Sequence, residues 1–465
     1  MKIVKLLMSG SIILIITMCK PPLEINQPVV NTVVKKTFTP LDTFFVNPGA
    51  GYYHWLWQEV APVPSIDRYS RVKWSDLEST EGVYNFSQLE SDAQAAKTDT
   101  DGPGILGIGI MSVFQDNGRS YPAYIDSKMT SWTSANKNCV VPDWNNAYFL
   151  DRVDSLLAAL GRKFNNDPRI GYIDIRSYGN WGEWHMSGFE SPPSPLQPIT
   201  LESKKRIIDA YIKAFPNKQL LMMSDGTEGM TYAMGITGLK YPIGWRRDSW
   251  GNSGFQTLKT SAAWSVTADR WKTAPVVIEG YGGTGVTNTD CPGQVLDYHA
   301  SAISNGNIGD WSTLSATAKT AMFQCAKVAG YHYVLRSFDC ADSLIIGKTN
   351  LVKTVWSNIG VAPTYKSWNV VFRLYDVTTN NTIFESNSSL DLKTLLPTYS
   401  YLSKIDKPIT VEDNLILPVN IAIGVYGLDL IVKDPTAYSW PMRLYIKDRK
   451  YNGAYSLGTI RVTNN

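Results

Sequence analysis

The sequence predicts an α/β protein: a (β/α)8 TIM barrel followed by a small all-β immunoglobulin-like sandwich. Strand-like and helix-like runs alternate eight times along the first part of the chain, which favours a closed parallel barrel. An open doubly wound sheet is the competing interpretation, but no Gly-rich dinucleotide fingerprint opens a helix. Beyond about Gly360, short alternating runs are separated by Asn, Pro, Asp and Gly turns, a pattern typical of a β-sandwich.

The expected barrel strands are runs rich in β-branched and aromatic residues. They lie at 44–53, 69–74, 104–112, 171–177, 219–224, 242–247, 275–281 and 331–337. Amphipathic helices are expected between them, most clearly at 147–164 and at 201–215, where Thr200 occupies the N-cap position. Further helices are expected at 254–265, 294–304 and 313–328.

The second domain is expected to be all β. Its strands are predicted at 370–377, 415–425, 428–432 and 442–446, with a hinge at 359–363. The predicted domains are therefore a catalytic barrel at 41–358 and a sandwich at 359–465. A chain of 465 residues is long enough for one large domain and one smaller one.

The N-terminus has the pattern of a targeting segment. Lys2 and Lys5 precede an apolar run, 6–16, that is too short to span a bilayer as a mature helix. The run leads into Ile-Thr-Met-Cys, which resembles a bacterial lipoprotein cleavage site with Cys19 as the acylated residue. We expect a signal peptide at 1–18 and export to the periplasm or cell surface, with the lipid as the only membrane contact. Export without acylation is the alternative.

Residues 19–40 contain four prolines and are predicted to form a tether that holds the barrel clear of the membrane. The cysteines beyond the tether are Cys139, Cys291, Cys325 and Cys340, with spacings that fit no zinc pattern. One disulfide among the last three, or four buried free thiols, are both compatible with the sequence.

The composition argues against nucleic acid as a partner. The net charge is only +3 and no basic run is present. Aromatic residues make up 12% of the chain, including 15 Trp, whereas charged residues make up 18%. A high aromatic content with few charged residues is compatible with a binding site for a neutral, ring-shaped ligand. It is equally compatible with a Trp-rich hydrophobic core.

The stretch 172–185, Tyr-Ile-Asp-Ile-Arg-Ser-Tyr-Gly-Asn-Trp-Gly-Glu-Trp-His, is the strongest functional signal. It begins as a strand and ends with Glu183 between Trp181 and Trp184, followed by His185. A carboxylate among aromatic rings at a strand end is costly to bury without purpose. Sugar rings stack on aromatic faces, and an apolar wall would raise the pKa of Glu183 towards that of a general acid.

A second carboxylate, Glu279, also ends a predicted strand beside an aromatic residue. In a (β/α)8 barrel, functional residues lie at the C-terminal ends of the strands, so Glu183 on strand four and Glu279 on strand seven would face one cleft. Two such carboxylates suffice to break a glycosidic bond. We expect Glu183 to be the acid/base and Glu279 the nucleophile, held by Arg247 and Tyr281. The alternative is that each Glu pairs with an Arg at the barrel rim.

Other side chains near the strand ends are expected to bind the substrate. They are His54, Trp57, Trp74, Asn180, Trp184, His185, Asp225, Arg247, Asp248, Trp250 and Tyr281. For several of them a structural role is as compatible with the sequence, because His185 can pack at the rim and Asp225-Gly226 also makes a good turn. The four His residues have no metal-site spacing, so neither a metal nor a cofactor is expected.

Several segments resemble a known family. The barrel resembles the retaining glycoside hydrolases of clan A, and 47–53, 71–86, 179–185 and 244–251 resemble the bacterial family labelled domain of unknown function 4832. The resemblance covers roughly residues 44–460 and implies an acid/base at the end of strand four and a nucleophile at the end of strand seven. Clan A enzymes usually carry Asn directly before the acid/base, whereas this chain has Gly182 there and Asn180 two positions earlier.

The expected function is therefore cleavage of a glycosidic bond in an oligo- or polysaccharide by a retaining mechanism, in an exported, monomeric protein. Retention requires carboxyl groups about 5–5.5 Å apart, and inversion about 6.5–9.5 Å. The first alternative is a non-catalytic carbohydrate-binding lipoprotein on a degenerate barrel. The second is a sandwich that docks glycan or a partner, although few aromatics beyond Tyr438 and Trp440 serve it.

Overall fold

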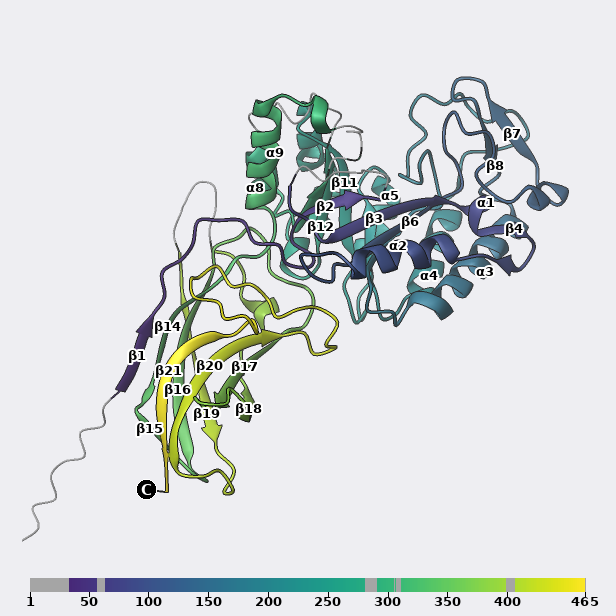
Figure 1. Cartoon of the computed structure of the whole chain (residues 1–465). Helices are drawn as coiled ribbons and strands as arrows, with labels where there is room; N and C mark the ends of the chain where they lie inside the picture. Colours follow the sequence, from purple (N-terminus) through teal and green to yellow (C-terminus); the bar gives the residue numbers. More distant parts are fainter. Residues whose placement is uncertain are drawn as a thin grey trace, which may run out of the picture. The chain divides into compact units, whose positions relative to one another are not determined.

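The computed structural model describes residues 33–56, 63–280, 291–304, 306, 311–398 and 406–464 (Figure 1). Within this part of the chain, none of the helices combines the length and hydropathy that a membrane span requires. The predicted signal peptide, the predicted lipidation site Cys19 and most of the predicted tether lie outside the described residues.

Eight parallel strands form a closed barrel, which confirms the predicted fold class. In chain order they are β2 (Gly51–Trp55), β3 (Asp67–Lys73), β6 (Leu106–Met111), β9 (Ile170–Ile175), β10 (Gln219–Met223), β11 (Gly244–Trp250), β12 (Val276–Gly280) and β13 (Ala302–Ser304). Each strand pairs with the next, and β13 pairs with β2 to close the ring. Most of their residues are buried, as expected for strands with helices outside and packed side chains inside.

The eighth barrel strand is not the one that we predicted. The run at 331–337 falls in β14 (Tyr333–Ala341), which pairs antiparallel with β16 (Thr349–Asn358) and not with the barrel. The strand that closes the barrel is β13, which has 3 residues and lies at the end of a stretch predicted as a helix. So short a strand carries no recognisable alternation, whereas the 9 residues of β14 carry a clear β pattern.

Helices follow most of the barrel strands (Figure 1). They are α1 (Trp74–Leu77), α2 (Ser87–Lys97), α3 (Ala147–Phe164), α4 (Leu201–Ala214), α5 (Thr227–Gly235), α6 (Trp264–Thr267), α8 (Cys291–Asp297) and α9 (Ala316–Val328). The predicted N-cap is confirmed, because the Thr200 hydroxyl accepts a hydrogen bond from the Ser203 backbone N–H at 3.2 Å. In place of the helix predicted at 254–265, a 3-10 segment, η2 (Ser253–Thr260), precedes α6.

Shorter elements decorate the barrel between its strands and helices. Two hairpins are made by β4 (Glu78–Thr80) with β5 (Val83–Tyr84) and by β7 (Ser131–Ser134) with β8 (Cys139–Pro142). The remaining 3-10 segments of the barrel region are η1 (Ala123–Ser127), η3 (Arg270–Lys272) and η4 (Trp311–Thr313). Cys139 on β8 is a buried free thiol.

The interior of the barrel is filled by large rings. Its cluster consists of Tyr53, Trp55, Tyr69, Tyr172, Leu221, Val277 and Ala302. These rings fit because β6 turns glycines inward: a Cβ on Gly107 would lie 2.2 Å from Cζ of Tyr172, and one on Gly109 would lie 2.5 Å from the Tyr69 hydroxyl. The glycines of β6 thus leave the space that the aromatic rings of the neighbouring strands occupy.

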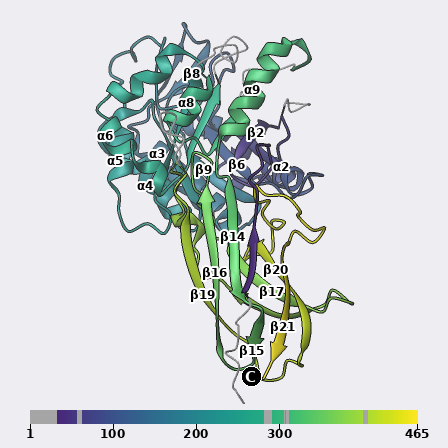
Figure 2. The same cartoon turned by 90° about the vertical axis from the view of Figure 1, so that its left-hand side faces the viewer.

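The rest of the chain forms two sheets around a second core (Figure 2). One sheet has the order β1 (Val33–Thr37), β14, β16 and β19 (Ile409–Ile416). The other has the order β15 (Ser343–Ile345), β21 (Tyr455–Thr463), β20 (Gly424–Lys433), β17 (Asn369–Tyr375) and β18 (Thr382–Asn387), with η5 (Leu392–Thr394) after β18. Trp356 on one sheet and Phe372 and Leu430 on the other belong to the shared core. This is the predicted β-sandwich architecture.

Three details of the sandwich differ from the sequence-based expectation. Strand β1 lies inside the predicted tether, and it pairs with β14 from Val33 opposite Ala341 to Thr37 opposite Ser337. The run predicted at 415–425 is split between the end of β19 and the start of β20 by a turn, and 442–446 forms no strand. Apolar residues at 442–446 are nevertheless buried in the sandwich core, which explains their strand-like pattern.

Candidate active site

Charged side chains occupy the barrel interior towards the C-terminal ends of the strands. Alternation along each strand points every second side chain inward. On β3 the inward side chains are Tyr69 and then Arg71, and on β12 they are Val277 and then Glu279. On β9 Tyr172 is followed inward by Asp174. Towards the C-terminal ends of the strands, a layer of aromatic rings is therefore followed by a layer of charged side chains, which we call the charge layer.

One arginine joins the two predicted catalytic carboxylates. Arg71 donates from Nη1 to Oε1 of Glu183 at 2.6 Å and from Nη2 to Oε2 of Glu279 at 3.1 Å. Its guanidinium lies 4.6 Å from the ring centroid of Trp55. The side chains of Arg71, Glu183 and Glu279 are 9%, 10% and 7% exposed, so each retains a small opening to solvent. Although the two carboxylates are far apart in sequence, they face one space.

Two further arginines, both fully buried, complete this charge layer. Arg246 donates from Nη2 to Oε2 of Glu279, and its Nε lies 3.7 Å from Asp174. Arg176 donates to Asp174 at 3.2 Å, and its Nη1 lies 3.6 Å from Oε1 of Glu183. Buried charges require partners of this kind, because removing one leaves another uncompensated.

A strained loop carries Glu183. Between β9 and the end of the motif, φ is positive at Ser177, Gly179, Trp181, Gly182 and Trp184. Non-glycine residues seldom adopt this conformation, and such strain concentrates at functional sites. Hydrogen bonds within the loop hold it, including those from Gly182 N to Gly179 O at 3.1 Å and from Glu183 N to Asn180 O at 2.8 Å.

Gly182 explains the departure from the Asn-Glu pattern of clan A. Its φ is +70°, and a Cβ there would lie 2.8 Å from Cβ of Arg176. An asparagine would therefore collide with the buried arginine. Asn180 does not replace it, because its side chain exchanges hydrogen bonds with the backbone N–H and side-chain oxygen of Gln115, at 3.1 and 2.9 Å.

The electrostatic setting of Glu183 differs from our expectation. We expected an apolar aromatic wall to raise its pKa. Burial does act in that direction, but Arg71, His185, Arg176 and Asp248 outweigh it and hold the pKa of Glu183 well below its usual range. His185 donates from Nε2 to Oε2 of Glu183 at 3.4 Å, while its Nδ1 accepts from the Ser187 N–H.

The pKa of Asp248 moves in the opposite direction to that of Glu183. Burial together with the negative charges of Glu279 and Glu183 raises the pKa of Asp248 well above its usual range, against the effect of Arg246 and Arg176. Its side chain is 16% exposed, and its Oδ1 lies 3.3 Å from Nε of Arg246. Asp248 thus joins Glu183 and Glu279 in the same space.

Asp225 and His185 lie at the rim of this space. Asp225 is 33% exposed and His185 is 24% exposed, the largest values among the charged groups around Glu183. Burial raises the pKa of Asp225, against the effects of Arg247 and His185. Half-buried Trp181 lies 6.0 Å from the His185 ring, so it is the tryptophan of the motif that reaches the rim.

Three predicted substrate-binding tryptophans lie in the outer core instead. Trp74, Trp184 and Trp250 are 1%, 3% and 0% exposed and belong to the cluster between barrel and helices. Each indole N–H has a protein acceptor, namely Glu78 for Trp74, Ile175 O for Trp184 and Ser304 O for Trp250. Their assignment to the cleft is corrected, since they pack under it.

Two more predicted binding residues have structural positions. His54 lies between inward-facing Tyr53 and Trp55 on β2, so alternation turns it towards the helices, where burial lowers its pKa to about 3. Arg247 does not contact Glu279. It donates to Phe255 O and Gly254 O and fixes η2, and the neighbouring Arg246 holds Glu279 instead.

The predicted binding residues Trp57 and Tyr281 lie outside the described residues. The arginines at positions 71, 176 and 246, which the sequence reading did not place in the site, carry much of its charge. The signal that reveals them is alternation counted backwards from the strand end, because Arg71 follows Tyr69, and Arg246 precedes Asp248, by two positions. Over the described parts of the chain, no cluster of His, Cys, Asp and Glu has the makings of a metal site.

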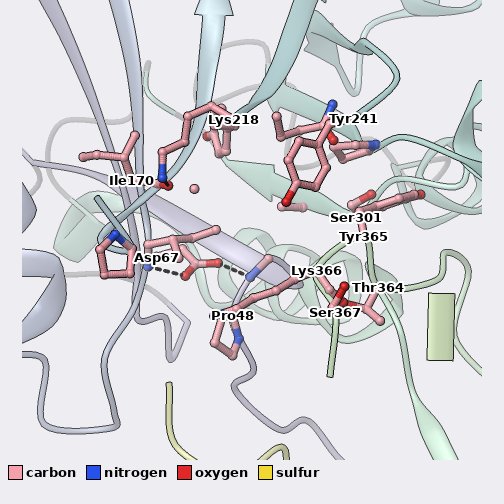
Figure 3. A pocket seen from close by; sticks show the side chains of 18 of the residues that line it. Pro48, Asp67, Ile170, Lys218, Tyr241, Ser301, Thr364, Tyr365, Lys366 and Ser367 are labelled. Atoms are coloured by element: carbon pink, nitrogen blue, oxygen red, sulfur yellow. Dashed lines mark hydrogen bonds between the residues drawn. The ribbon is translucent and has the colours of Figure 1, made fainter. Parts of the chain in front are cut away.

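A separate cavity of about 640 Å³ lies at the opposite, N-terminal end of the barrel strands (Figure 3). Lys218, Tyr241, Tyr365 and Lys366 surround it, and Asp67 lies in its wall. Its charged groups Asp67, Lys218 and Lys366 have partners within the protein: Asp67 accepts from Gly49 N at 2.6 Å and from Ile105 N at 3.0 Å, and the two lysines donate to protein oxygens. The hydroxyls of Tyr53 and Tyr172, which also line the cavity, have no hydrogen-bond partner among the described residues.

No protein-family model and no curated protein sequence matches this chain. Solved structures with a similar trace include endo-glycoceramidase II from Rhodococcus sp., at 10% identity and a TM-score of 0.37 over 74% of this chain and 88% of that one. A second is an exo-beta-1,4-mannosidase from Opitutaceae bacterium strain TAV5, at 12% identity and a TM-score of 0.35 over 56% of this chain and 52% of that one. A third is a glycoside hydrolase family 5 enzyme from Prevotella bryantii B14, at 11% identity and a TM-score of 0.37 over 56% of this chain and 82% of that one. TM-scores this low carry no activity over to this chain.

Proposed function

We propose that the chain is a glycoside hydrolase that cleaves an oligo- or polysaccharide with retention, using Glu279 as nucleophile and Glu183 as acid/base. The observation that carries the proposal is the bridge from Arg71 to both carboxylates, at the end of the barrel where functional residues gather. Carboxylates that share one guanidinium are close enough to act on one sugar ring, as the two-carboxylate mechanism requires.

The chemistry follows from this arrangement. Arg71 and Arg246 orient the Glu279 carboxylate, which attacks the anomeric carbon. As the glycosidic bond breaks, the leaving oxygen takes a proton from the Glu183 carboxyl group. In the second step Glu183 removes a proton from water as the water oxygen attacks the anomeric carbon, and the bond from that carbon to Glu279 breaks to release the Glu279 carboxylate. His185 orients Glu183 throughout, and Asp225 and Trp181 at the rim are available to bind sugar hydroxyls and a sugar face.

The charge layer counts against the carbohydrate-binding alternative. A binder would need an open aromatic cleft, but three of the tryptophans predicted to form it are packed in the core. Paired buried carboxylates serve catalysis better than binding. The resemblance to the domain of unknown function 4832 family, the lipid anchor at Cys19, export and a monomeric state remain part of the proposal on the strength of the sequence.

The proposal is tested by screening aryl glycosides and plant, algal and host polysaccharides with the wild type, Glu279→Ala and Glu202→Gln. Glu202 is an exposed glutamate in the first turn of α4, so its variant controls for loss of a surface carboxylate. We expect turnover by the wild type and Glu202→Gln only. Activity in Glu279→Ala would exclude Glu279 as nucleophile.

Glu183→Gln then separates enzyme from binder. The enzyme loses turnover and still binds sugar, whereas a binding protein is unchanged. For an active substrate, the 2-fluoro glycoside should label Glu279, as read by mass spectrometry of the digested protein, and proton NMR of the first product anomer reports retention. Inverted product would reassign Glu279 as the base that activates water.

A further inference from the structure

Six side chains of the charge layer form a closed ring of alternating charge. Each arginine lies between two carboxyl groups and each carboxyl group lies between two arginines, with nitrogen–oxygen distances of 3.7 Å or less. In order around this ring, which we call the charge ring, the members are Glu183, Arg71, Glu279, Arg246, Asp174 and Arg176. Asp248 lies beside the ring, 3.3 Å from Nε of Arg246. Because the ring is closed, none of its buried charges has only one partner.

The charge ring joins the two proposed catalytic carboxylates twice. One connection is Arg71, which contacts both carboxylates directly and is 9% exposed. The other connection consists of three fully buried side chains, those of Arg176, Asp174 and Arg246. This second connection is closed to solvent. Its members therefore do not touch a substrate and can act only through the two glutamates.

Asp174 is the centre of the buried connection. Its Oδ2 accepts hydrogen bonds from the Tyr69 hydroxyl at 2.5 Å and from Nε of Arg176 at 3.2 Å, and Nε of Arg246 lies 3.7 Å from the same oxygen. Tyr69 is itself fixed, because its fully buried ring stacks on that of Tyr172, with the ring centroids 6.3 Å apart. One carboxylate oxygen therefore sets the positions of both arginines, and packed rings set the position of that oxygen.

The buried connection also links the barrel strands to the loop that carries Glu183. Asp174 and Arg246 are inward residues of the fourth and sixth barrel strands, and alternate strands of such a barrel fill one layer. Arg176 reaches the loop, because its Nη1 donates to the backbone oxygen of Trp181 at 2.8 Å and lies 3.6 Å from Oε1 of Glu183. A carboxylate on a loop thus takes its position from side chains on rigid strands.

We propose that Asp174 is a positioning residue that holds the two catalytic carboxylates at their working separation through the two fully buried arginines. The inference rests on the proposed function, in which the carboxyl groups must lie about 5–5.5 Å apart. Asp174 fixes this separation from the closed side of the site, while Arg71 fixes it from the side that is open to solvent.

The ring also keeps its arginines in place during the reaction. When Glu279 becomes an ester, it loses its negative charge. Arg246 then keeps Asp174 as a partner. Arg71 likewise keeps Glu183. Neither arginine is left without a counter-charge, so both remain in position to receive the carboxylate that the second step releases.

The first test compares two tyrosines that differ in one hydrogen bond. Tyr69→Phe removes the hydroxyl that donates to Asp174, whereas Tyr172→Phe removes a buried hydroxyl with no hydrogen-bond partner among the described residues. Each change keeps the stacked ring. We expect kcat of Tyr69→Phe to fall roughly 10-fold with KM within about twofold of the wild type, because a hydrogen bond to a charged group is lost. Tyr172→Phe should keep the wild-type kcat and KM.

The second test is Asp174→Asn, which keeps the shape of the side chain and removes the charge that both arginines share. Misplacing a reacting group by about 1 Å costs on the order of 10²-fold, so kcat should fall by roughly that factor while KM is retained. The matched control is Asp269→Asn, which changes an exposed aspartate paired with Lys272. Turnover is expressed per active site, counted from the covalent label that a 2-fluoro glycoside leaves on Glu279.

Counting the active sites separates positioning from folding. A purely structural role would lower the number of labelled sites and leave kcat per site at the wild-type value, which would overturn the inference. Equal kcat per site in Tyr69→Phe and Tyr172→Phe would overturn it too, and this comparison decides even if Asp174→Asn fails to fold. In both cases the proposed function stands. A wild type that neither cleaves a glycoside nor takes up the label would instead overturn the proposed function, and the role of Asp174 with it.

Discussion

The two ends of the barrel use buried charge in opposite ways. At the C-terminal end, carboxyl groups and arginines crowd together, and Asp174 and Asp248 each keep an oxygen without a hydrogen bond from any described residue. At the N-terminal end, Asp67, Lys218 and Lys366 surround a cavity of about 640 Å³, and each of them bonds to nearby backbone or side-chain atoms. A large cavity is therefore not the better candidate site. The opposite pKa shifts of Glu183 and Asp248, together with the crowding of paired charges, mark the C-terminal end.

The largest expected difference between the two ends is in turnover. Glu279→Gln removes the nucleophile and should lower kcat by on the order of 10⁶-fold, as measured with the best aryl glycoside. The same kind of change at the other end, Asp67→Asn, should leave kcat within a factor of two of the wild type. Equal losses in the two variants would erase the distinction between the ends.

Arg71→Met sharpens the comparison within the C-terminal end. It removes the group that joins the two carboxylates, so kcat/KM should fall by roughly 10²–10³-fold. Since Arg71 is one of the groups that lower the pKa of Glu183, that pKa should rise. The alkaline limb of the pH–rate profile, which the general acid sets, should then move to higher pH. An unchanged profile would show that the bridge has no part in the chemistry.

At the N-terminal end, charge should affect stability and not turnover. Burial raises the pKa of Asp67 from 3.8 to about 7, although hydrogen bonds from Ile105 N and Gly49 N oppose this. The folded protein keeps this proton up to about pH 7, whereas the unfolded chain releases it near pH 4. The contribution of Asp67 to stability is therefore greatest at low pH and is lost as the pH rises towards 7, by roughly 4 kcal/mol.

Urea unfolding of the wild type and Asp67→Asn between pH 4 and 8 measures this effect. In Asp67→Asn, most of this pH dependence of the unfolding free energy should disappear. The unfolding free energy should also be lower at every pH by about 1–3 kcal/mol, because the amide NH₂ cannot accept the hydrogen bond of a backbone N–H. Parallel stability curves for the two proteins would contradict the assignment.

The smallest effect is expected from filling the cavity. Ala302→Val adds two carbons to a small inward side chain that lines it. If the cavity has no ligand to hold, thermal stability should rise by about 0.5–2 kcal/mol with unchanged kcat and KM. A drop in activity would connect the N-terminal end to function.

The fold could be predicted because strand–helix alternation extends over hundreds of residues. The last barrel strand could not, since β13 has 3 residues and a neighbouring sheet strand offers a stronger pattern. Glu183 and Glu279 were identified because they end strands. Trp74, Trp184 and Trp250 were misplaced because sequence does not tell which side of a strand end an indole takes.

The charge layer was missed for a related reason. The predicted site residues were chosen near the strand ends, where Arg247 was preferred to its neighbour Arg246, whereas Arg71 lies further inside its strand at an inward position. A charged residue in a buried parallel strand is unusual enough to attract attention. Reading the inward register of all eight strands would have brought the three arginines and Asp174 into the prediction.

Gly182 cannot be exchanged for the asparagine of clan A barrels without a second change. A single Gly182→Asn step puts a new carbon 2.8 Å from Cβ of Arg176, an atom that every residue except glycine carries, so position 176 must lose its side chain before or together with it. Shrinking the arginine alone strips Asp174 and Glu183 of a counter-charge. Positions 176 and 182 can therefore be exchanged only together, because either single change gives a poorly tolerated protein.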